Sequence, residues 1–182
     1  MKTLKILFAV VIITGFASSA VGQDNPDTSI DASATIFSTI TITGTQDINF
    51  GGVEANSDIA ELDPQNSNTV NFAGLGGVDA QLGIFDITGE NNASITITVD
   101  ESKVQLTNGD NQIDFTPEFA YAQGNTNADG DDGLSNGNGN NKTLSAEGKG
   151  QVFVGGELGD RTGEPAGLYE NKEAITVSVE YN

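Results

Sequence analysis

The last nine residues constrain the fold most, because they alternate strictly between apolar and polar side chains. Residues 174–182 are A-I-T-V-S-V-E-Y-N, which gives one face the following four side chains: Ile175, Val177, Val179 and Tyr181. A period of two in β-branched and aromatic residues is typical of a strand with one buried face. Chain ends are usually held loosely, so this pattern predicts a closing strand that contributes to the core of a sheet.

The rest of the chain predicts more short strands and no helix. No segment keeps a period of 3.6, and the 23 Gly residues disfavour helices. Strands are expected at 30–36, 40–42, 46–50, 69–73, 80–88, 94–99, 104–106, 113–115, 118–122, 143–146 and 151–157. Asn108-Gly109 predicts a tight hairpin, because both residue types tolerate positive φ. We therefore expect an all-β, Ig-like antiparallel β-sandwich of about nine strands.

Residues 124–141 differ from the rest, since 14 of these 18 residues are Gly, Asn or Asp. So little apolar content predicts a long surface loop that buries nothing. Oxygen-bearing side chains at short spacing within it are candidate Ca²⁺ ligands: Asn127, Asp129, Asp131 and Asp132. Their spacing departs from the EF-hand pattern, so a solvated loop without an ion is the alternative. We expect no other cofactor.

The N-terminus predicts export. Lys2 and Lys5 precede and interrupt an apolar run that extends to Ile13, and small residues follow it. This arrangement is typical of a cleaved signal peptide at residues 1–22, which leaves one domain at residues 23–182. The apolar run is short for a membrane span. The expected location is the periplasm, the extracellular space or the cell surface, with a fold that has no disulfides because Cys is absent.

Composition excludes several classes of function. The chain has 26 Asp and Glu against 7 Lys and Arg, and this acidic balance disfavours nucleic acid and anionic membranes as partners. It has no His, Cys or Trp, which removes the commonest catalytic nucleophile–base pairs, and no pair of carboxylates stands out. We expect no enzymatic activity.

The segment after the signal peptide suggests assembly. Polar residues 24–29 precede an amphipathic strand whose apolar positions are Ile30, Ala32, Ala34 and Ile36. Such a strand either completes its own sheet or inserts into a neighbouring subunit, where main-chain hydrogen bonds and side-chain pockets hold it. Both outcomes stay open at the level of sequence.

Three stretches carry a family resemblance: A-S-A-T-I-F-S-T-I-T-I-T-G-T-Q-D-I-N-F-G at 32–51, V-G-G-E-L-G at 154–159 and P-A-G-L-Y-E-N-K-E-A-I-T-V-S-V-E-Y-N at 165–182. Together they resemble an exported bacterial family, domain of unknown function 4402. That family is similar to spore-coat-U-like proteins and to pilins of alternative chaperone–usher fimbriae. The resemblance implies a sandwich without catalytic residues.

For the pilin relatives, the resemblance further implies polymerisation by donor-strand exchange. The donor positions would be Ile30, Ala32, Ala34 and Ile36, and the groove strand would carry Ile175, Val177, Val179 and Tyr181. A structural or surface-interaction protein, self-assembling or served by a periplasmic chaperone and usher, is the expected function. The alternative is a monomeric extracellular module that binds a ligand or a carbohydrate.

Overall fold

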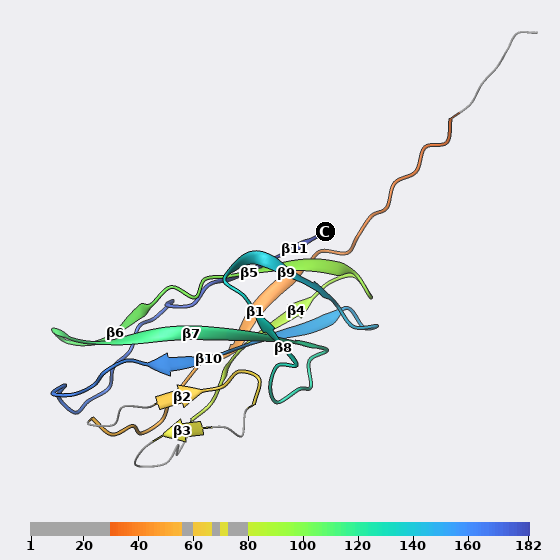
Figure 1. The fold of residues 1–182 in the computed structure, drawn as a ribbon. Coiled ribbons are helices and arrows are strands. Elements are labelled where there is room, and N and C mark those ends of the chain that lie inside the picture. The colour runs from red at the N-terminus through yellow and green to blue at the C-terminus, as the bar shows by residue number, and fades with distance from the viewer. Residues whose placement is uncertain (1–29, 56–59, 67–69, 73–79) are drawn as a thin grey trace, which may run out of the picture. The chain divides into compact units, whose positions relative to one another are not determined.

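The computed structural model describes residues 30–55, 60–66, 70–72 and 80–182. It divides into two units, residues 1–35 and residues 36–182, and the second unit carries every described strand (Figure 1). The predicted signal peptide at 1–22 lies outside the described residues.

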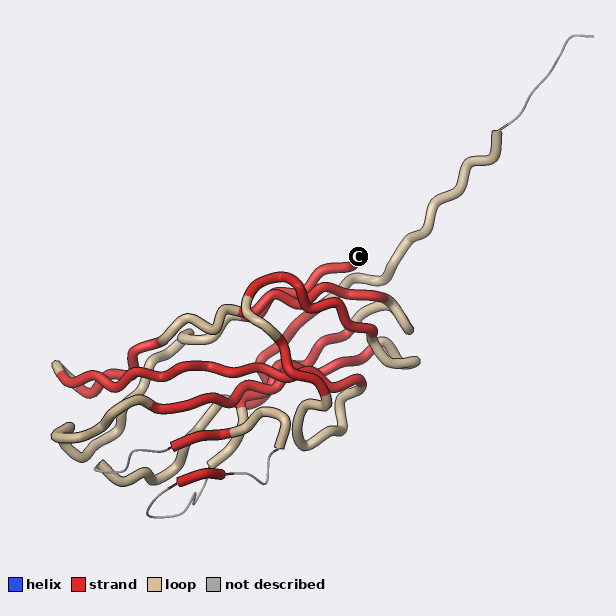
Figure 2. Tube along the Cα trace, in the orientation of Figure 1, coloured by secondary structure: helices blue, strands red, loops and turns tan. Residues whose placement is uncertain are grey.

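The described residues form eleven strands and no helix, and hence no helix that could cross a membrane (Figure 2). The strands are β1 (Thr41–Gln46), β2 (Ala60–Leu62), β3 (Val70–Phe72), β4 (Gly83–Thr88), β5 (Ser94–Val99), β6 (Val104–Asn108), β7 (Asn111–Gln123), β8 (Asp132–Leu134), β9 (Gly137–Thr143), β10 (Lys149–Leu158) and β11 (Val177–Tyr181). All pairings are antiparallel, which confirms the predicted all-β class.

β10 is the centre of the larger, eight-stranded sheet. Along one edge it pairs with β4 and then with β2, and along the other edge it pairs with β7. β1 continues the sheet beyond β4, β3 continues it beyond β2, and β6 and β8 pair with opposite ends of β7. The smaller sheet has the order β11-β5-β9.

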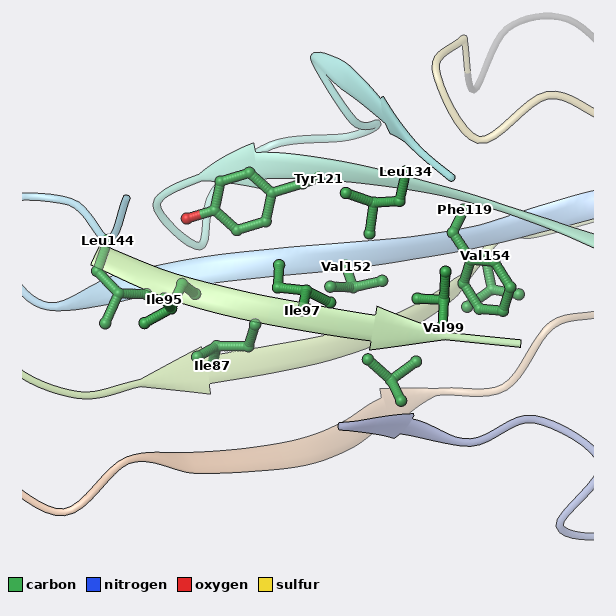
Figure 3. Packing of buried hydrophobic residues seen from close by; sticks show 11 residues of the cluster. Ile87, Ile95, Ile97, Val99, Phe119, Tyr121, Leu134, Leu144, Val152 and Val154 are labelled. Carbon is green, nitrogen blue, oxygen red and sulfur yellow. The ribbon is translucent and has the colours of Figure 1, made fainter. Parts of the chain in front are cut away.

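The main core lies between the two sheets. The smaller sheet supplies Ile95, Ile97 and Val99 from β5, and these pack against residues of β4, β7 and β10 (Figure 3). Buried members from the larger sheet include Ile87, Phe119, Tyr121, Val152 and Val154. The sandwich predicted from alternating strands is therefore present, and its core comes from the inward positions of both sheets.

A second apolar cluster buries the opposite face of β10. Phe153 alternates with Val152 and Val154 and packs with this cluster, whose other buried members are Phe50, Ala60, Leu62, Leu82, Ile113, Phe115, Ala122 and Leu158. Phe50 and Phe115 meet edge to face, with ring centroids 5.4 Å apart. β10 is consequently buried on both faces.

The strands expected at 113–115 and 118–122 are one continuous strand, β7. Pro117 lies inside it, opposite Gly156 of β10. Gly156 has φ 128°, and a Cβ there would lie 2.1 Å from the Thr116 carbonyl oxygen. A glycine thus allows the close approach that keeps the strand paired around a proline.

The strand expected at 30–36 is not formed. Among the described residues, none before Thr41 belongs to a strand. The predicted hairpin is present, but its two loop residues are Gly109 and Asp110, since Asn108 pairs with Asn111. Only Gly109 of these two has positive φ, at 64°.

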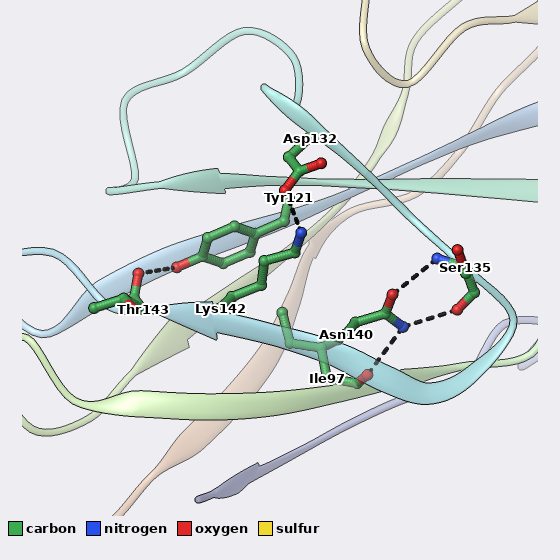
Figure 4. Close-up of polar contacts among 7 residues, drawn as sticks. All are labelled: Ile97, Tyr121, Asp132, Ser135, Asn140, Lys142 and Thr143. Carbon is green, nitrogen blue, oxygen red and sulfur yellow. Dashed lines mark hydrogen bonds and ion pairs between the residues drawn. The ribbon is translucent and has the colours of Figure 1, made fainter.

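The long loop expected at 124–141 is wrong in its second half, which contains β8 and most of β9. Leu134 is buried in the main core. Asn140 is also buried, and its side-chain amide donates to the carbonyl oxygens of Ile97 and Ser135 while its oxygen accepts from the Ser135 amide (Figure 4). Leu134, the satisfied Asn140 amide and the pairing of β8 with β7 and of β9 with β5 hold this polar segment in the fold.

Candidate functional site

β1 and β11 are edge strands of opposite sheets that contact each other without pairing (Figure 3). In the described part of the chain, β1 pairs with β4 alone and β11 pairs with β5 alone. No backbone hydrogen bond joins β1 to β11. We call this break in pairing the β1/β11 seam, defined by Thr41–Gln46 and Val177–Tyr181.

Apolar side chains at the seam are only half-buried. Ile42 of β1 and Val179 of β11 are partly exposed, whereas Ile95 and Ile97 of the neighbouring β5 are fully buried. The partly buried residues that pack on the main core are Ile40, Ile42, Ile48, Phe85, Ile175, Val179 and Tyr181. The seam therefore combines two uncovered strand edges with apolar surface that further burial would stabilise.

β1 has neither a charged residue nor a Pro to protect its edge, although its register with β4 shifts between Gly44 and Gln46. Natural edge strands are commonly blocked by Lys, by Pro or by inward-pointing charges. No charged residue and no Pro lies between Asp31 and Asp47, in a chain with 26 Asp and Glu. β11 carries one charged residue, Glu180. An edge of this kind favours pairing with another strand.

A ring of hydrogen bonds closes one end of the seam. The Tyr181 hydroxyl donates to the Ser38 carbonyl oxygen at 2.9 Å and accepts from the Glu90 amide at 2.7 Å. The Glu90 carboxylate in turn accepts from the Ser38 amide at 3.1 Å and from the Ser38 hydroxyl at 2.8 Å. Phe37 stacks on the Tyr181 ring, with centroids 4.9 Å apart. We call Ser38, Glu90 and Tyr181 the clasp.

Two further features support the clasp. A Cβ at Gly89 would lie 2.6 Å from the Tyr181 hydroxyl oxygen, so a glycine at this turn leaves space for the phenol. The hydrogen bonds from Ser38, first from its hydroxyl and then from its amide, lower the pKa of the Glu90 carboxyl below its usual 4.5. Glu90 is thus held in the charged form that accepts both bonds.

The comparison with protein families covers both strands of the seam. A family model described as a domain of unknown function (DUF4402) matches residues 40–181. The chain belongs to the DUF4402 family. The match runs from just before β1 to the end of β11, and it leaves out the predicted donor positions Ile30 to Ile36. No curated protein matches the chain.

In this DUF4402 chain, the predicted donor and groove positions differ in structure. Ile30 and Ile36 are 92% and 91% exposed, and Ala32 and Ala34 are exposed as well. Along the predicted groove strand, Val177 is buried and the other three members, Ile175, Val179 and Tyr181, are half-buried. The polar residues between them, Thr176, Ser178 and Glu180, are exposed, as the alternation predicts. Strand donation itself stays a prediction.

The contacts of the four candidate Ca²⁺ ligands do not bring these side chains together around a common point. Asp132 forms an ion pair with Lys142 (Figure 4), and the Asn127 amide nitrogen of the side chain donates to the Gln123 carbonyl oxygen at 3.2 Å. Asp129 and Asp131 carry the other two carboxylates of the set. Among the described residues, no group of three or more His, Cys, Asp or Glu is arranged to hold a metal ion. Calcium binding gains no support from this arrangement.

A shallow depression lies beside this ion pair. It has a volume of about 230 Å³ and is lined by Tyr121, Gln123, Asp131, Asp132, Lys142 and Thr143. The Tyr121 hydroxyl donates to the Thr143 carbonyl oxygen at 2.8 Å. Burial raises the pKa of Tyr121 to about 12, so the phenol stays protonated and keeps this bond. The depression is thus lined by polar side chains and by one nearly buried tyrosine.

Sequence reasoning identified Tyr181 but missed Ser38 and Glu90. These partners are separated from Tyr181 by 143 and 91 residues along the chain. No periodicity or motif marks contacts of that range, because the topology of the two sheets creates them. The sequence does mark one part of the clasp, because Gly89-Glu90 lies at a turn between two predicted strands.

Proposed function

We propose that this DUF4402 chain is a secreted, non-enzymatic structural protein of the cell surface that assembles by donor-strand exchange. Residues 24–36 of one copy would occupy the β1/β11 seam of another. The observation that carries the proposal is the seam itself. Two strand edges face each other there without pairing, and half-buried apolar side chains lie beside them. A donated strand supplies both main-chain hydrogen bonds and apolar contacts.

The charge distribution supports a second copy as the occupant. With a formal net charge of −19, most surfaces of two copies repel each other. The segment from 32 to 46 is uncharged and includes β1 and three of the four apolar donor positions, Ala32, Ala34 and Ile36. Contact through this segment avoids the repulsion that other surfaces would impose.

Length and apolar content also fit. β1 has six residues and β11 has five, so each extends for roughly 16–20 Å at about 3.3 Å per residue. Residues 30–36 in an extended conformation span about 23 Å, which is enough to cover either strand. Burial of two Ile and two Ala would contribute roughly 3–7 kcal/mol before ordering costs.

Resemblance gives further support. The DUF4402 family resembles spore-coat-U-like proteins and pilins of alternative chaperone–usher fimbriae, and the first 22 residues of this chain have the pattern of a signal peptide. A periplasmic chaperone and an usher are the partners that this resemblance implies, since an unfilled seam needs protection before assembly.

Size-exclusion chromatography with light scattering, over a range of concentrations, tests the proposal. We expect oligomers from residues 23–182 and a folded monomer from residues 37–182 that binds an added 24–36 peptide. A stable full-length monomer at all concentrations would contradict strand exchange. Ile36→Asp should abolish assembly while the fold survives, and Leu168→Asp is the matched control, because Leu168 is 75% exposed elsewhere in the domain.

The depression beside Tyr121 supports a second candidate function, a monomeric module that binds an extracellular ligand or carbohydrate. Its lining combines a tyrosine with amide, carboxylate and ammonium groups, and polar groups of these kinds orient small ligands. Calorimetric titration with a panel of soluble oligosaccharides tests it. Binding that is lost in Lys142→Ala and kept in the exposed control Lys103→Ala would favour this function.

A further inference from the structure

We propose that Asn136 is a self-modifying site, at which the Gly137 backbone nitrogen attacks the side-chain amide of Asn136 and converts this residue into aspartate or isoaspartate. The site lies in the connection between β8 and β9, which belong to different sheets. It is therefore separate from the β1/β11 seam, and the inference goes beyond the proposed function. The reaction changes both the charge and the main chain at this connection.

The reaction uses neighbouring groups of the chain and water alone. The Gly137 nitrogen loses its proton and forms a bond to Cγ of Asn136, and the bond between Cγ and Nδ2 then breaks, so that Nδ2 leaves with that proton as ammonia. Water adds to either carbonyl group of the resulting cyclic imide, which gives aspartate or isoaspartate. Attack within a chain is favoured because the two groups are already close together, and a glycine hinders it least because it has no Cβ.

The sequence offers three Asn-Gly pairs, and the structure distinguishes them. They begin at Asn108, Asn136 and Asn138. Asn108 is the last residue of β6 and is half-buried. A Cβ at Gly167 would lie 2.2 Å from Nδ2 of Asn108, so the leaving group at this site is closely packed. Its carbonyl oxygen also accepts from the Asn111 side chain at 3.2 Å. The side chain of Asn108 thus has little room to rotate for the reaction.

Asn138 is exposed, but it lies inside β9. β9 pairs with β5 on both sides of this residue, at Gly137 and at Asn140. Closure of the imide ring requires rotation of the main chain around the asparagine, and pairing on both sides opposes such a rotation. We therefore expect Asn138 to react slowly in the folded protein.

Asn136 combines the features that the other two residues lack. It is exposed and follows β8 without belonging to a strand. The Glu101 backbone amide donates to Oδ1 of Asn136 at 3.4 Å. Negative charge develops on this oxygen when the nitrogen attacks, and a donor already directed at it stabilises that charge. Gly137 has φ 92°, a conformation that favours glycine, so the fold itself requires the least hindered nucleophile at this position.

The modification would disturb a turn that depends on Asn140. The buried Asn140 side chain accepts from the Ser135 amide at 2.8 Å and donates to the carbonyl oxygens of Ser135 and Gly137 at 2.8 and 3.3 Å (Figure 4). Isoaspartate carries the main chain through its own side chain, which lengthens the path between Ser135 and Gly137, so that Asn140 no longer fits both. The new carboxylate also lies beside Glu101 in a chain whose formal net charge is already −19. The reaction should therefore loosen the start of β9.

Peptide mapping of the aged full-length chain tests the site. We would incubate the folded protein at neutral and at mildly alkaline pH, in parallel with the same chain unfolded in urea, and locate each amide loss by tandem mass spectrometry. In the folded protein we expect loss of most of the Asn136 amide while Asn108 and Asn138 keep theirs, and faster loss at alkaline pH because the attacking nitrogen must lose its proton. In urea the three sites should react alike. Equal loss at the three sites of the folded protein, or slower loss at Asn136 than at either other site, would overturn the inference.

Variants test the site and its consequence. Asn136→Gln keeps an amide but would have to close a larger ring, so its aged chain should lose the shift toward the anode on native gels, whereas the matched control Asn138→Gln should keep it. Hydrogen exchange of the converted natural chain should show lower protection at the start of β9 than the fresh chain, with β10 unchanged, and aged Asn136→Gln should keep its protection. An undiminished gel shift in Asn136→Gln would overturn the site. Unchanged protection of β9 in the converted natural chain would overturn the loosening of the turn.

Discussion

β10 and β1 belong to the same sheet, but they differ in how completely their edges and faces are covered. β10 pairs along both edges, and eight of its ten residues are buried, with apolar clusters on both faces. β1 pairs along one edge, and five of its six residues are exposed. Burial of β10 therefore contributes most to the free energy of folding, whereas β1 and its neighbour β11 keep strand edges that can make further contacts. Binding elements are commonly drawn from the less stable part of a domain.

The largest expected contrast comes from side-chain truncation. Phe153→Ala in β10 removes a fully buried ring and should lower the free energy of unfolding by about 3–5 kcal/mol. Ile42→Ala in β1 removes a half-buried side chain and should cost about 1–2 kcal/mol. Urea unfolding followed by far-ultraviolet circular dichroism measures both values. Equal losses would mean that the seam is as tightly packed as the centre.

Adding a methyl group tests the same contrast in the opposite sense. A Cβ at Gly155 of β10 would lie 2.0 Å from the Leu62 carbonyl oxygen, so Gly155→Ala must displace backbone and should cost about 3 kcal/mol or more. A Cβ at Gly44 of β1 would meet only the Phe85 ring, at 3.5 Å. Gly44→Ala should be neutral within about 0.5 kcal/mol, or slightly stabilising through the unfolded state.

Thermal unfolding of the two glycine variants gives the comparison directly. Gly139→Ala on β9 is a second control, because a Cβ there has no atom within 4 Å. A destabilised Gly44→Ala variant with an intact Gly139→Ala variant would show that β1 is packed more closely than its exposure suggests.

A charge on the edge of β1 should affect assembly rather than folding. Thr43 is exposed, and Thr43→Lys places a cation on an edge that has none. Stability should change by no more than about 0.5 kcal/mol, whereas oligomers should be lost, because lysine on an edge strand opposes pairing. Asn138→Lys on β9 adds the same charge at an exposed position outside the seam, and it should assemble normally in light scattering. Loss of assembly in both variants would point to charge alone.

Sequence patterns predicted the strands that bury one face and missed the contacts that depend on topology. The 94–99 strand was predicted with the observed bounds, because Ile95, Ile97 and Val99 alternate with polar residues and all three are buried. The bounds of β10 and β11 were close for the same reason. Hydrophobic periodicity works where a side chain has a core to enter.

Two segments show why periodicity fails elsewhere. Residues 30–36 alternate well and form no strand, whereas 137–143 hardly contain an apolar residue and form β9. Pairing with a neighbouring strand decides whether each segment forms a strand. β9 pairs with β5, and the buried Asn140 amide donates to the carbonyl oxygens of Ile97 and Ser135. The sequence supplies a strand's pattern but not its partner, and for the clasp the partners are separated by up to 143 residues.

The smallest expected effect is a loosening of the seam in acid. The pKa of the Glu90 carboxyl is lowered by Ser38 in the folded state, so this carboxylate contributes stability above its unfolded pKa near 4.5, and the contribution is lost as pH falls through the lower folded value. Hydrogen exchange, corrected for intrinsic rates and compared at about pH 6 and about pH 3, should show lower protection in acid at Ser38. β10 should keep its protection, because its amides bond to strands on both sides. Glu90→Gln has no carboxylate to protonate, so its clasp should respond less to acid than the natural one. An equal response of the two proteins would mean that acid acts on the seam through groups other than Glu90.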